Sequence, residues 1–508
     1  MNKRRVPSLL GSAVAALLLA GCTVGPKYHR PSATPQAPPA AYKESPAQIP
    51  DAGPWKPAEP QDAMLRGKWW EIYNDPELNS LEEQLNINNQ NIKQAFENFM
   101  AARAMIAEAR SQLFPTIGTT PSYQRSRSSQ NVGNSANNNG TGGSTTGSGN
   151  TGGQAISIFS LPADISWAPD LWGKVRNAIH QAQYNAQLSA ADLENERLTE
   201  QASLAIFLFE LRGQDALQKI FEETIEADKK SVELTRARYE TGIDDQIALV
   251  QAQTALESAE AAGTNLGVAR AQFEHAIAVL IGASPSSFSL PVTAQYFTPP
   301  AIPLGMPSQL LERRPDIAAS ERMMAAANAQ IGIAVAAYYP TLTLSASGGF
   351  ESSAFSTLLS WPSRFWSVGP SLSETIFDAG LRRATVHQFE ATYNADVASY
   401  RQTVLAAFQQ VEDSLATVRI LSKQIEQEQE AERSSERYLE LAKSRYYTGV
   451  DTYLNVLVAQ TTLLSSQQTL ASLRTQAASA SVQLIEALGG GWDLSQLPSP
   501  AQVSEKAH

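Results

Sequence analysis

Two stretches of the chain combine an unusual length with the residue pattern of a helix. Residues 174–241 contain no proline and a single glycine, Gly213, and residues 381–448 contain neither. Each stretch has 68 residues (241 − 174 + 1 and 448 − 381 + 1), and at a rise of 1.5 Å per residue such a helix extends about 100 Å. In the second stretch apolar residues recur in steps of three and four, as in a coiled coil: Val404, Phe408, Val411, Leu415, Val418 and Ile425.

A strictly alternating pattern precedes the second long stretch. Trp366, Val368, Pro370 and Leu372 alternate with serine and glycine, and residues 341–346 alternate in the same way. This two-residue period predicts strands with one apolar and one polar face. The small polar residues opposite tryptophan, valine and leucine favour a membrane barrel over a soluble, half-buried sheet.

The first half carries a weaker version of the strand pattern. Ile165 and Trp167 fit it, but we expect Pro162 to interrupt it. Residues 128–154 consist almost entirely of Ser, Asn, Gly, Thr and Gln, which predicts an exposed loop. Two hairpins give four strands, too few to close a barrel, and open sheet edges are not tolerated in lipid. We therefore expect the chain to associate with copies of itself.

The chain contains one unit twice. The heptapeptide RYETGID at 238–244 returns as RYYTGVD at 445–451, a displacement of 207 (445 − 238). The same displacement carries Gly173 onto Gly380 and Gly282 onto Gly489. Upstream, FPT at 114–116 returns as YPT at 339–341, a displacement of 225 (339 − 114). We infer a tandem duplication whose halves differ in loop length.

Each repeated heptapeptide predicts a turn between two helices. Gly242 and Gly449 can adopt the left-handed conformation that ends a helix. Asp244 and Asp451 are then expected to cap the following helix through side-chain bonds to its free amides. A long helical hairpin with a defined tip results in each half.

These patterns divide the chain. We predict a signal peptide at 1–21, a lipidated extended segment at 22–72, a first repeat at 73–282, a proline-rich crossover at 283–306, a second repeat at 307–489 and a tail at 490–508. Each repeat has a β-hairpin, at about 115–168 and 340–377, and a helical hairpin, at 173–282 and 380–489.

The N-terminus predicts a lipid anchor. A basic patch and an apolar run lead to LAGC at 19–22, which is similar to a bacterial lipobox, and Cys22 is the only cysteine of the chain. Acylation of Cys22 would anchor the mature protein. Thr23 stands where an aspartate often retains lipoproteins at the inner membrane, so the outer membrane is favoured. The alternative is an ordinary signal peptide with an incidental cysteine.

The remaining chemistry argues against catalysis and against nucleic-acid binding. The formal net charge is −11, whereas nucleic-acid binders usually have a basic face. The five histidines are scattered, and no metalloprotease, nucleophile-elbow or phosphate-loop motif is present. We expect no enzyme activity, no metal site and no cofactor other than the lipid on Cys22.

Several short motifs in order resemble one family. They are GPKY at 25–28, WW at 69–70, DPEL at 75–78, AARA at 101–104 and, most specifically, LERRPDI at 311–317. Together they are similar to the NodT/OprM-type branch of TolC-like outer-membrane efflux proteins, over residues 22–493. The resemblance implies an α+β membrane protein: a homotrimer with a long periplasmic α-helical barrel and a 12-stranded outer-membrane β-barrel. It also implies a periplasmic adaptor and an inner-membrane resistance-nodulation-division (RND) pump as partners.

Both tips are candidates for adaptor docking, because they are the parts of each hairpin farthest from the outer membrane. The residues are Arg238, Tyr239, Gly242 and Asp244 of the first tip, and Arg445, Tyr446, Gly449 and Asp451 of the second. The arginines and tyrosines are the expected contacts. The glycines and aspartates have a sufficient structural role as turn and cap residues.

The start of the last long helix is a candidate gate. It resembles the family's constriction, where an apolar ring is followed one turn later by an acidic ring. Here Leu454 fits the apolar ring, but Val458 occupies the acidic position, so we predict a hydrophobic closure that also involves Tyr453. Asp451 could add an acidic ring. Alternatively, Leu454 and Val458 pack in the coiled-coil core.

Two other motifs have a structural explanation. In Arg313-Arg314-Pro315-Asp316, Pro315 suits the first position of a helix and Asp316 its N-terminus. The tryptophan pair at 69–70 suits packing better than ligand binding.

Other functions remain open from the residues alone. A lipid-anchored coiled coil without a pore is opposed by the alternating strands. The duct of a type I protein secretion system, or of a metal-ion efflux pump, would share the architecture. The sequence does not name the exported compound.

Overall fold

The computed structural model describes residues 23–34, 42–43, 67–127, 155–294, 300, 302 and 310–505. The predicted signal peptide, Cys22 and the loop at 128–154 lie outside these residues. The chain forms two compact units. The first comprises residues 1–28, 104–182 and 327–392, and the second comprises residues 29–103, 183–326 and 393–508.

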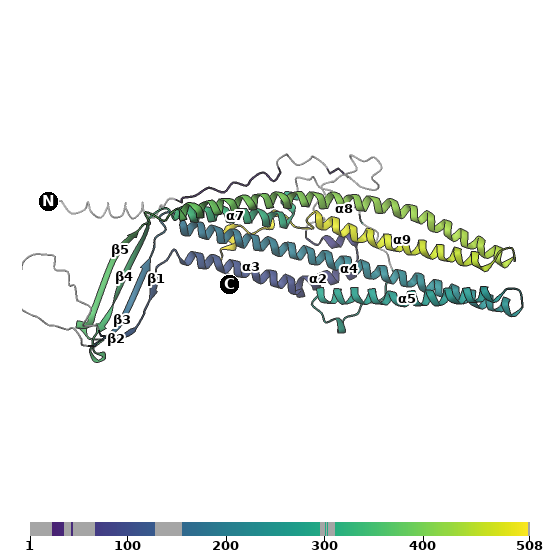
Figure 1. Cartoon of the computed structure of the whole chain (residues 1–508), viewed down its shortest axis with the longest axis horizontal. Coiled ribbons are helices and arrows are strands. Elements are labelled where there is room, and N and C mark those ends of the chain that lie inside the picture. The colour runs from purple at the N-terminus through teal and green to yellow at the C-terminus, as the bar shows by residue number, and fades with distance from the viewer. Residues whose placement is uncertain are drawn as a thin grey trace, which may run out of the picture. The chain divides into compact units, whose positions relative to one another are not determined.

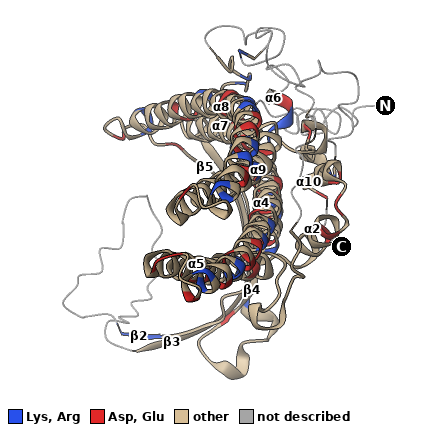
Figure 2. Ribbon diagram, turned by 90° about the vertical axis from the view of Figure 1, so that its right-hand side faces the viewer, with Lys and Arg blue, Asp and Glu red and all other residues tan. Residues whose placement is uncertain are grey.

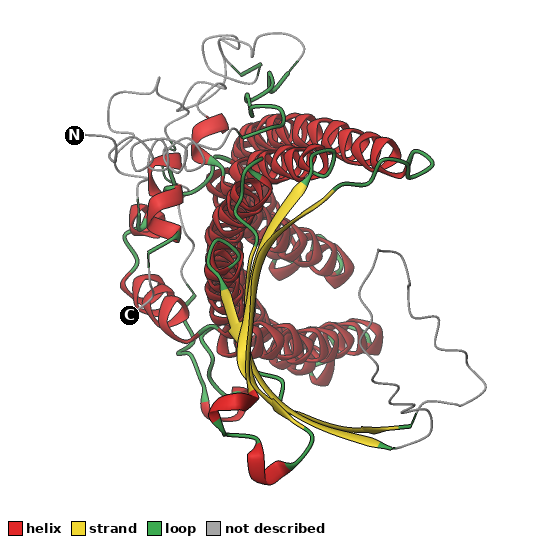
Figure 3. Cartoon of the chain, turned by 90° about the vertical axis from the view of Figure 1, so that its left-hand side faces the viewer, coloured by secondary structure: helices red, strands yellow, loops and turns green. Residues whose placement is uncertain are grey.

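The first unit is built on one antiparallel sheet, drawn as a curved layer in Figure 3. Its strands run in the order β1-β3-β4-β5, with β2 also paired to β3. Short 3-10 helices, η5 (Phe355–Thr357) and η6 (Trp361–Ser363), lie between the last two strands. The strands are β1 (Thr116–Gly118), β2 (Ser122–Ser126), β3 (Ile156–Trp167), β4 (Thr341–Ser352) and β5 (Arg364–Ser373).

Strand register separates an apolar from a polar face, as the alternation predicts. Val368 pairs with Ala346, which pairs with Ile165, and Pro370 pairs with Leu344, which pairs with Trp167. The apolar face also includes Phe159, Leu161, Leu342, Phe350, Trp366 and Leu372; the polar face includes Ser160, Asp164, Ser166, Thr343, Ser345, Ser347, Ser367 and Ser371, with Ile156, Ile158 and Phe365 as exceptions. The single chain leaves the apolar face bare: Trp366 is 80% exposed and Leu372 is 69% exposed.

Pro162 does not interrupt its own strand, so that expectation was wrong. β3 is a 12-residue strand that runs through Pro162 without a break. The break lies instead in the neighbouring strand. β1 and β2 keep one register against β3, and the gap between them lies opposite Pro162. Proline has no N–H to donate across this gap, and the Thr119 hydroxyl donates to the Pro162 carbonyl at 2.6 Å instead. β1 and β2 are therefore two parts of one strand.

The N-terminal segment of the first unit is fixed at the junction between strands and helices. The Val24 N–H donates to the carbonyl of Trp172, 3.1 Å away. The side-chain amide of Asn177 donates to the Val24 carbonyl at 3.1 Å, and that of Asn328 donates to the Pro26 carbonyl at 3.0 Å. The backbone that follows Cys22 is thus bound on both sides.

Two of the helices are exceptionally long, and each is followed by a shorter helix that runs back along it (Figure 1). α4 (Lys174–Glu240) and α8 (Leu381–Tyr447) each have 67 residues, and α5 (Gln246–Leu280) and α9 (Tyr453–Ala487) each have 35. The others are η2 (Trp69–Tyr73), α2 (Pro76–Asn88), α3 (Gln90–Ser111), η3 (Pro285–Ser287), α6 (Leu310–Arg313), α7 (Pro315–Ala336), η7 (Leu494–Gln496) and α10 (Pro500–Val503).

None of the helices in the described part of the chain has the length and apolarity needed to cross a membrane. Their charged residues are distributed along the long helices in both signs (Figure 2). This distribution is typical of solvated faces.

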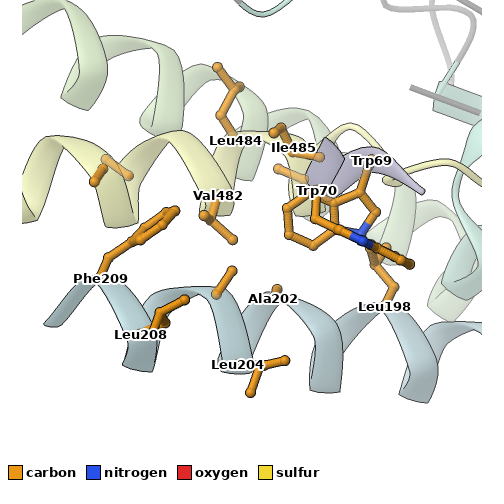
Figure 4. Packing of buried hydrophobic residues seen from close by; sticks show 14 of the residues in the cluster. Trp69, Trp70, Leu198, Ala202, Leu204, Leu208, Phe209, Val482, Leu484 and Ile485 are labelled. Atoms are coloured by element: carbon orange, nitrogen blue, oxygen red, sulfur yellow. The ribbon is translucent and has the colours of Figure 1, made fainter. Parts of the chain in front are cut away.

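Apolar residues at three- and four-residue spacing form the core of the second unit. Val404, Val411, Leu415 and Val418 are buried, which confirms the coiled-coil pattern. Around them, α4 and α9 face each other with the tryptophan pair packed at one end (Figure 4). The residues of this core that Figure 4 labels are Trp69, Trp70, Leu198, Ala202, Leu204, Leu208, Phe209, Val482, Leu484 and Ile485.

The tryptophan pair and the DPEL motif are both structural. Trp69 donates its indole N–H to Gln201 at 3.2 Å from inside the core. Asp75 caps α2 by accepting from the Leu78 N–H at 2.8 Å. The buried guanidinium of Arg212 donates to Asp75 and to Glu77, both at 2.6 Å. A charge-assisted cluster thus fixes the start of α2 on α4.

The RRPD motif joins two helix ends. Pro315 is the first residue of α7, and Asp316 accepts from the Ile317 N–H at 2.8 Å. Arg314 donates to Asp316 at 2.6 Å and to the carbonyl of Ala487, the last residue of α9, at 2.9 Å. The Arg313 carbonyl lies against Gly489, where a Cβ would be only 2.2 Å from the carbonyl oxygen.

We predict that Gly489→Ala destabilises the protein more than Gly380→Ala. The two glycines have nearly equal φ, +92° and +89°, so both alanines incur the left-handed strain of about 1–2 kcal/mol. Only Gly489 meets a backbone atom, because nothing lies within 4 Å of a Cβ at Gly380. The midpoint of thermal unfolding should therefore fall by several degrees more in Gly489→Ala. Equal shifts would contradict the close approach to Arg313.

Candidate functional site: the hairpin tips

The turn of each helical hairpin forms as the sequence predicts. We call residues 238–245 the first tip and residues 445–452 the second tip. Gly242 has φ +72° and Gly449 has φ +75°, both in the left-handed region. The N–H after each glycine returns to an arginine carbonyl, from Ile243 to Arg238 at 2.8 Å and from Val450 to Arg445 at 3.0 Å.

The predicted capping by Asp244 and Asp451 was wrong. α5 is capped by the next residue, Asp245, whose side chain accepts from the Ala248 N–H at 3.1 Å. The N-cap of α9 is Thr452, and its side chain makes no capping bond. The predicted carboxylates instead accept from an arginine six residues earlier, which offers a stronger, charge-assisted bond than a helix amide does.

The two arginine–aspartate pairs have the same shortest distance but different surroundings. Arg238 donates to Asp244 at 2.8 Å, and Arg445 donates to Asp451 at 2.8 Å. These bonds hold the pKa of each carboxyl below its usual range. Arg238 is largely covered, whereas the Arg445 side chain is 59% exposed.

Tyr446 connects the second tip to the first. Its hydroxyl donates to Asp244, and the Arg238 guanidinium lies over its ring, 4.7 Å from the centroid. Its ring also contacts that of Tyr453, with centroids 5.5 Å apart. Burial, followed by the hydrogen bond to Asp244, raises the pKa of Tyr446, so the hydroxyl stays protonated.

A small apolar core lies behind the tips. It joins all four helices of the two hairpins through side chains that are mostly small. Its buried members are Val232, Ala248, Ala252, Ala442, Tyr446, Tyr453, Val456 and Ala459.

The structure separates the predicted docking residues into buried and exposed sets. Tyr446 is only 2% exposed, so its prediction as a surface contact was wrong; it serves the contact between tips. Arg238 and Asp244 are used in the same contact. Tyr239, the counterpart of Tyr446 in the first repeat, is exposed. Tyr239 and Arg445 remain available to a partner.

The predicted gate residues are likewise divided. Tyr453 is buried in the core behind the tips, which contradicts a direct role in lining a pore. Leu454 and Val458 are about half exposed, 49% and 47%, so they are not in the core of their own chain. Asp451 is bound by Arg445 and by the Asn455 side-chain amide at 2.6 Å, so it is not a free carboxylate.

Comparison with known proteins identifies the family. Residues 81–283 and 306–490 match the family model described as outer membrane efflux protein. The chain belongs to the outer membrane efflux protein family.

Relatives of this outer membrane efflux protein cover nearly its whole length. The probable efflux pump outer membrane protein TtgC of Pseudomonas putida is 32% identical over 487 residues, 96% of both chains. Outer membrane protein OprJ of Pseudomonas aeruginosa is 31% identical, covering 95% of this chain and 96% of OprJ. The solved outer-membrane channel OprN superposes with a TM-score of 0.79 at 29% identity, over 93% of this chain and 100% of OprN.

These relatives confirm the family resemblance that the sequence motifs carry. The chain is an outer-membrane efflux duct and not an enzyme. Sequence reasoning missed two roles at the first tip: Asp245 is the cap of α5, and Asp244 is the partner of Arg238. Two adjacent aspartates fit a cap equally well in the sequence, and only the arginine six residues earlier distinguishes them.

We predict that charge reversal disturbs the two tips unequally. Arg238→Glu would place a negative charge beside Asp244 and remove the cation from the Tyr446 ring. Loss of a partly buried ionic partner costs about 1–3 kcal/mol, or roughly tenfold or more in local opening. Amide hydrogen exchange should therefore accelerate about tenfold in residues 232–248 and 442–456. Arg445→Glu, at an exposed pair, should change exchange little. Equal effects would contradict the contact between tips.

Proposed function

We propose that this protein is the exit duct of a tripartite RND-type efflux pump, acting as a homotrimer that passively conducts small organic molecules. The observation that carries the proposal is the sheet, with one apolar face, one polar face and two open edges. Relatives in Pseudomonas putida are named as toluene and antibiotic efflux pump outer membrane proteins. Such cargo is small and organic.

The open sheet supports association into a closed barrel. β1 with β2 forms one edge and β5 forms the other. In hydrocarbon each unpaired backbone group costs several kcal/mol, so an open edge cannot persist there. Counting β1 and β2 as one strand, three chains supply twelve strands (3 × 4). The apolar face then meets lipid, and the polar face lines the duct.

The bound N-terminal segment supports lipid anchoring through Cys22. Val24, two residues after the cysteine, is held at Trp172, directly before α4. An acyl chain on Cys22 would therefore begin at the junction where the strands end. The aromatic ring of Trp172 stacks on Tyr339 there, with centroids 4.8 Å apart, as in an interfacial aromatic belt.

Equal element lengths support the tandem duplication. α4 and α8 have 67 residues each, and α5 and α9 have 35 each. The family model also matches the chain in two separate segments.

We place adaptor docking at the exposed residues of both tips. Tyr239 and Arg445 supply an aromatic ring and a cation, the residue types that most often dominate interfaces. Ile243 and Val450, next to the turn glycines, are also exposed and add apolar surface. The inner-membrane pump would be reached through the adaptor.

We place the resting gate at Leu454 and Val458. They lie four residues apart on one face of α9, opposite the buried Tyr453 and Val456. Repeated in three chains, they form two apolar rings that exclude water and ions. Asp451 is paired with Arg445 and therefore does not add a ring of free carboxylates.

Docking is tested by the double variant Tyr239→Ala/Arg445→Glu. It should abolish cross-linking to the adaptor and reduce drug resistance at least several-fold, with normal trimer levels. The control is Arg437→Glu, an exposed arginine on α8 that pairs with Glu440. Retained cross-linking in the double variant would contradict docking at these residues.

The duct and its gate are tested by single-channel recording in planar bilayers. The wild type should insert and remain mostly closed, and Leu454→Ser/Val458→Ser should raise the conductance several-fold. Cells that express this variant should become sensitive to vancomycin. Leu405→Ser/Ile420→Ser, at exposed positions on another helix, α8, is the control. No conductance from any assembled trimer would refute the duct, and unchanged conductance of the variant alone would refute the gate.

A further inference from the structure

The charged residues of the sheet are divided between its two faces. The strands carry four of them. Asp164 and Glu351 belong to the polar face, as their pairing with Ser347 and Ser160 shows. Arg125 lies two residues from Tyr123 on the apolar face, and Arg364 pairs with Phe350 on that face. The two cations therefore stand on the side that the proposed function turns toward lipid.

Both arginines lie at the end of the sheet remote from the helices. Arg364 begins β5, and Arg125 is the penultimate residue of β2. The opposite strand ends lead to α4 and α8. From Trp366 to Leu372 the apolar positions of β5 extend about 20 Å at 3.3 Å per residue, close to the apolar band of about 25 Å in membrane barrels. Arg364 thus stands at the outer edge of that band.

An apolar hollow lies between the two arginines. It has a volume of about 680 Å³ and is lined mainly by Tyr123, Phe159, Leu161, Phe355, Leu358 and Leu359. The ring of Phe159 lies 4.6 Å from that of Tyr123 and 5.7 Å from that of Phe355. Phe159 belongs to the apolar face, so the segment between β4 and β5 folds over the end of this face.

Neither arginine is neutralised within the described parts of the chain. No carboxylate there pairs with Arg125 or Arg364. Among the described residues Arg364 donates to the Trp361 carbonyl alone, at 3.1 Å, and its guanidinium lies over the Trp361 ring. Two unpaired guanidinium groups beside an apolar hollow at a membrane boundary call for an anionic, acylated ligand.

We propose that this end of the sheet binds lipid A, the phosphorylated and multiply acylated part of lipopolysaccharide. Its phosphates would meet Arg125 and Arg364, and one acyl chain would enter the hollow. The arginines stand three strand spacings apart, on β2 and β5, and the register also displaces them by four residues along the strands, from the row of Ser157 to that of Leu161. At 4.8 Å per strand and 3.3 Å per residue their backbones are therefore about 20 Å apart. Two long arginine side chains that lean toward each other can meet the phosphates at the two ends of a disaccharide over such a distance, whereas the single phosphate of a phospholipid cannot meet both.

The proposal rests on the proposed function in one respect, that the sheet crosses the outer membrane with its helices on the periplasmic side. The ligand lies on the lipid face and not in the duct. Lipid binding and conduction can therefore fail separately.

The test is native mass spectrometry of the purified, full-length trimer titrated with lipid A. Arg125→Gln/Arg364→Gln should lower the apparent affinity about tenfold or more, because each substitution removes a charge-assisted bond to phosphate. The control, Arg433→Gln/Arg437→Gln, removes two exposed arginines of α8 and should bind as the wild type does. Unchanged affinity of the first variant, or an equal loss in the control, would overturn the proposal.

Two further probes act on the wild-type protein and do not depend on the variant folding. Dephosphorylated lipid A should bind about tenfold more weakly than lipid A, and phosphatidylglycerol should not compete at equal concentration. Equal binding of the dephosphorylated lipid, or preference for phosphatidylglycerol, would overturn the lipid A site. Planar-bilayer conductance of the same preparation separates the two claims: conducting trimers without lipid A selectivity would refute this inference alone.

Discussion

The structure depends on one constraint: a strand has no water to complete its hydrogen bonds inside hydrocarbon. The chain presents a sheet with two unpaired edges and an apolar face on which Trp366 is 80% exposed. Neither feature is stable in one copy. In the proposed trimer, association would pair the edges, lipid would cover the apolar face, and the polar face would be left around a central passage. The long helices follow the strands closely in the chain: α4 begins at Lys174 after β3 ends at Trp167, and α8 begins at Leu381 after β5 ends at Ser373.

The two hairpins show how one repeated motif acquires two roles. The second tip keeps an exposed pair between Arg445 and Asp451. In the first tip the same pair is covered by Tyr446, which reaches across from the second repeat. One tip is thereby held to the other, and only one arginine remains open to solvent. A partner that approached the tips would meet different chemistry on each, although their sequences are nearly the same.

Features with a period were predictable, and features that depend on distant contacts were not. The absence of helix breakers predicted α4 and α8, and alternation predicted the faces of β5. The RYxTG motif could not show that Tyr446 is buried and Tyr239 exposed, because the difference depends on the other hairpin. Nor could the sequence show that Gly25 approaches Gly332, where a Cβ on Gly25 would lie 2.6 Å from the Gly332 Cα.

The equal helix lengths have a consequence for which changes evolution can accept. The two repeats are offset by 225 residues before the strands and by 207 after them. The strand region of the first half is therefore 18 residues (225 − 207) longer than that of the second. One residue inserted into α4 or α8 would lengthen that helix by 1.5 Å and rotate everything beyond it by about 100°. Such an insertion would bring Asp244 and Tyr446 out of register. The 18-residue difference between the halves accordingly lies in the strand region, whereas α4 and α8 have the same length.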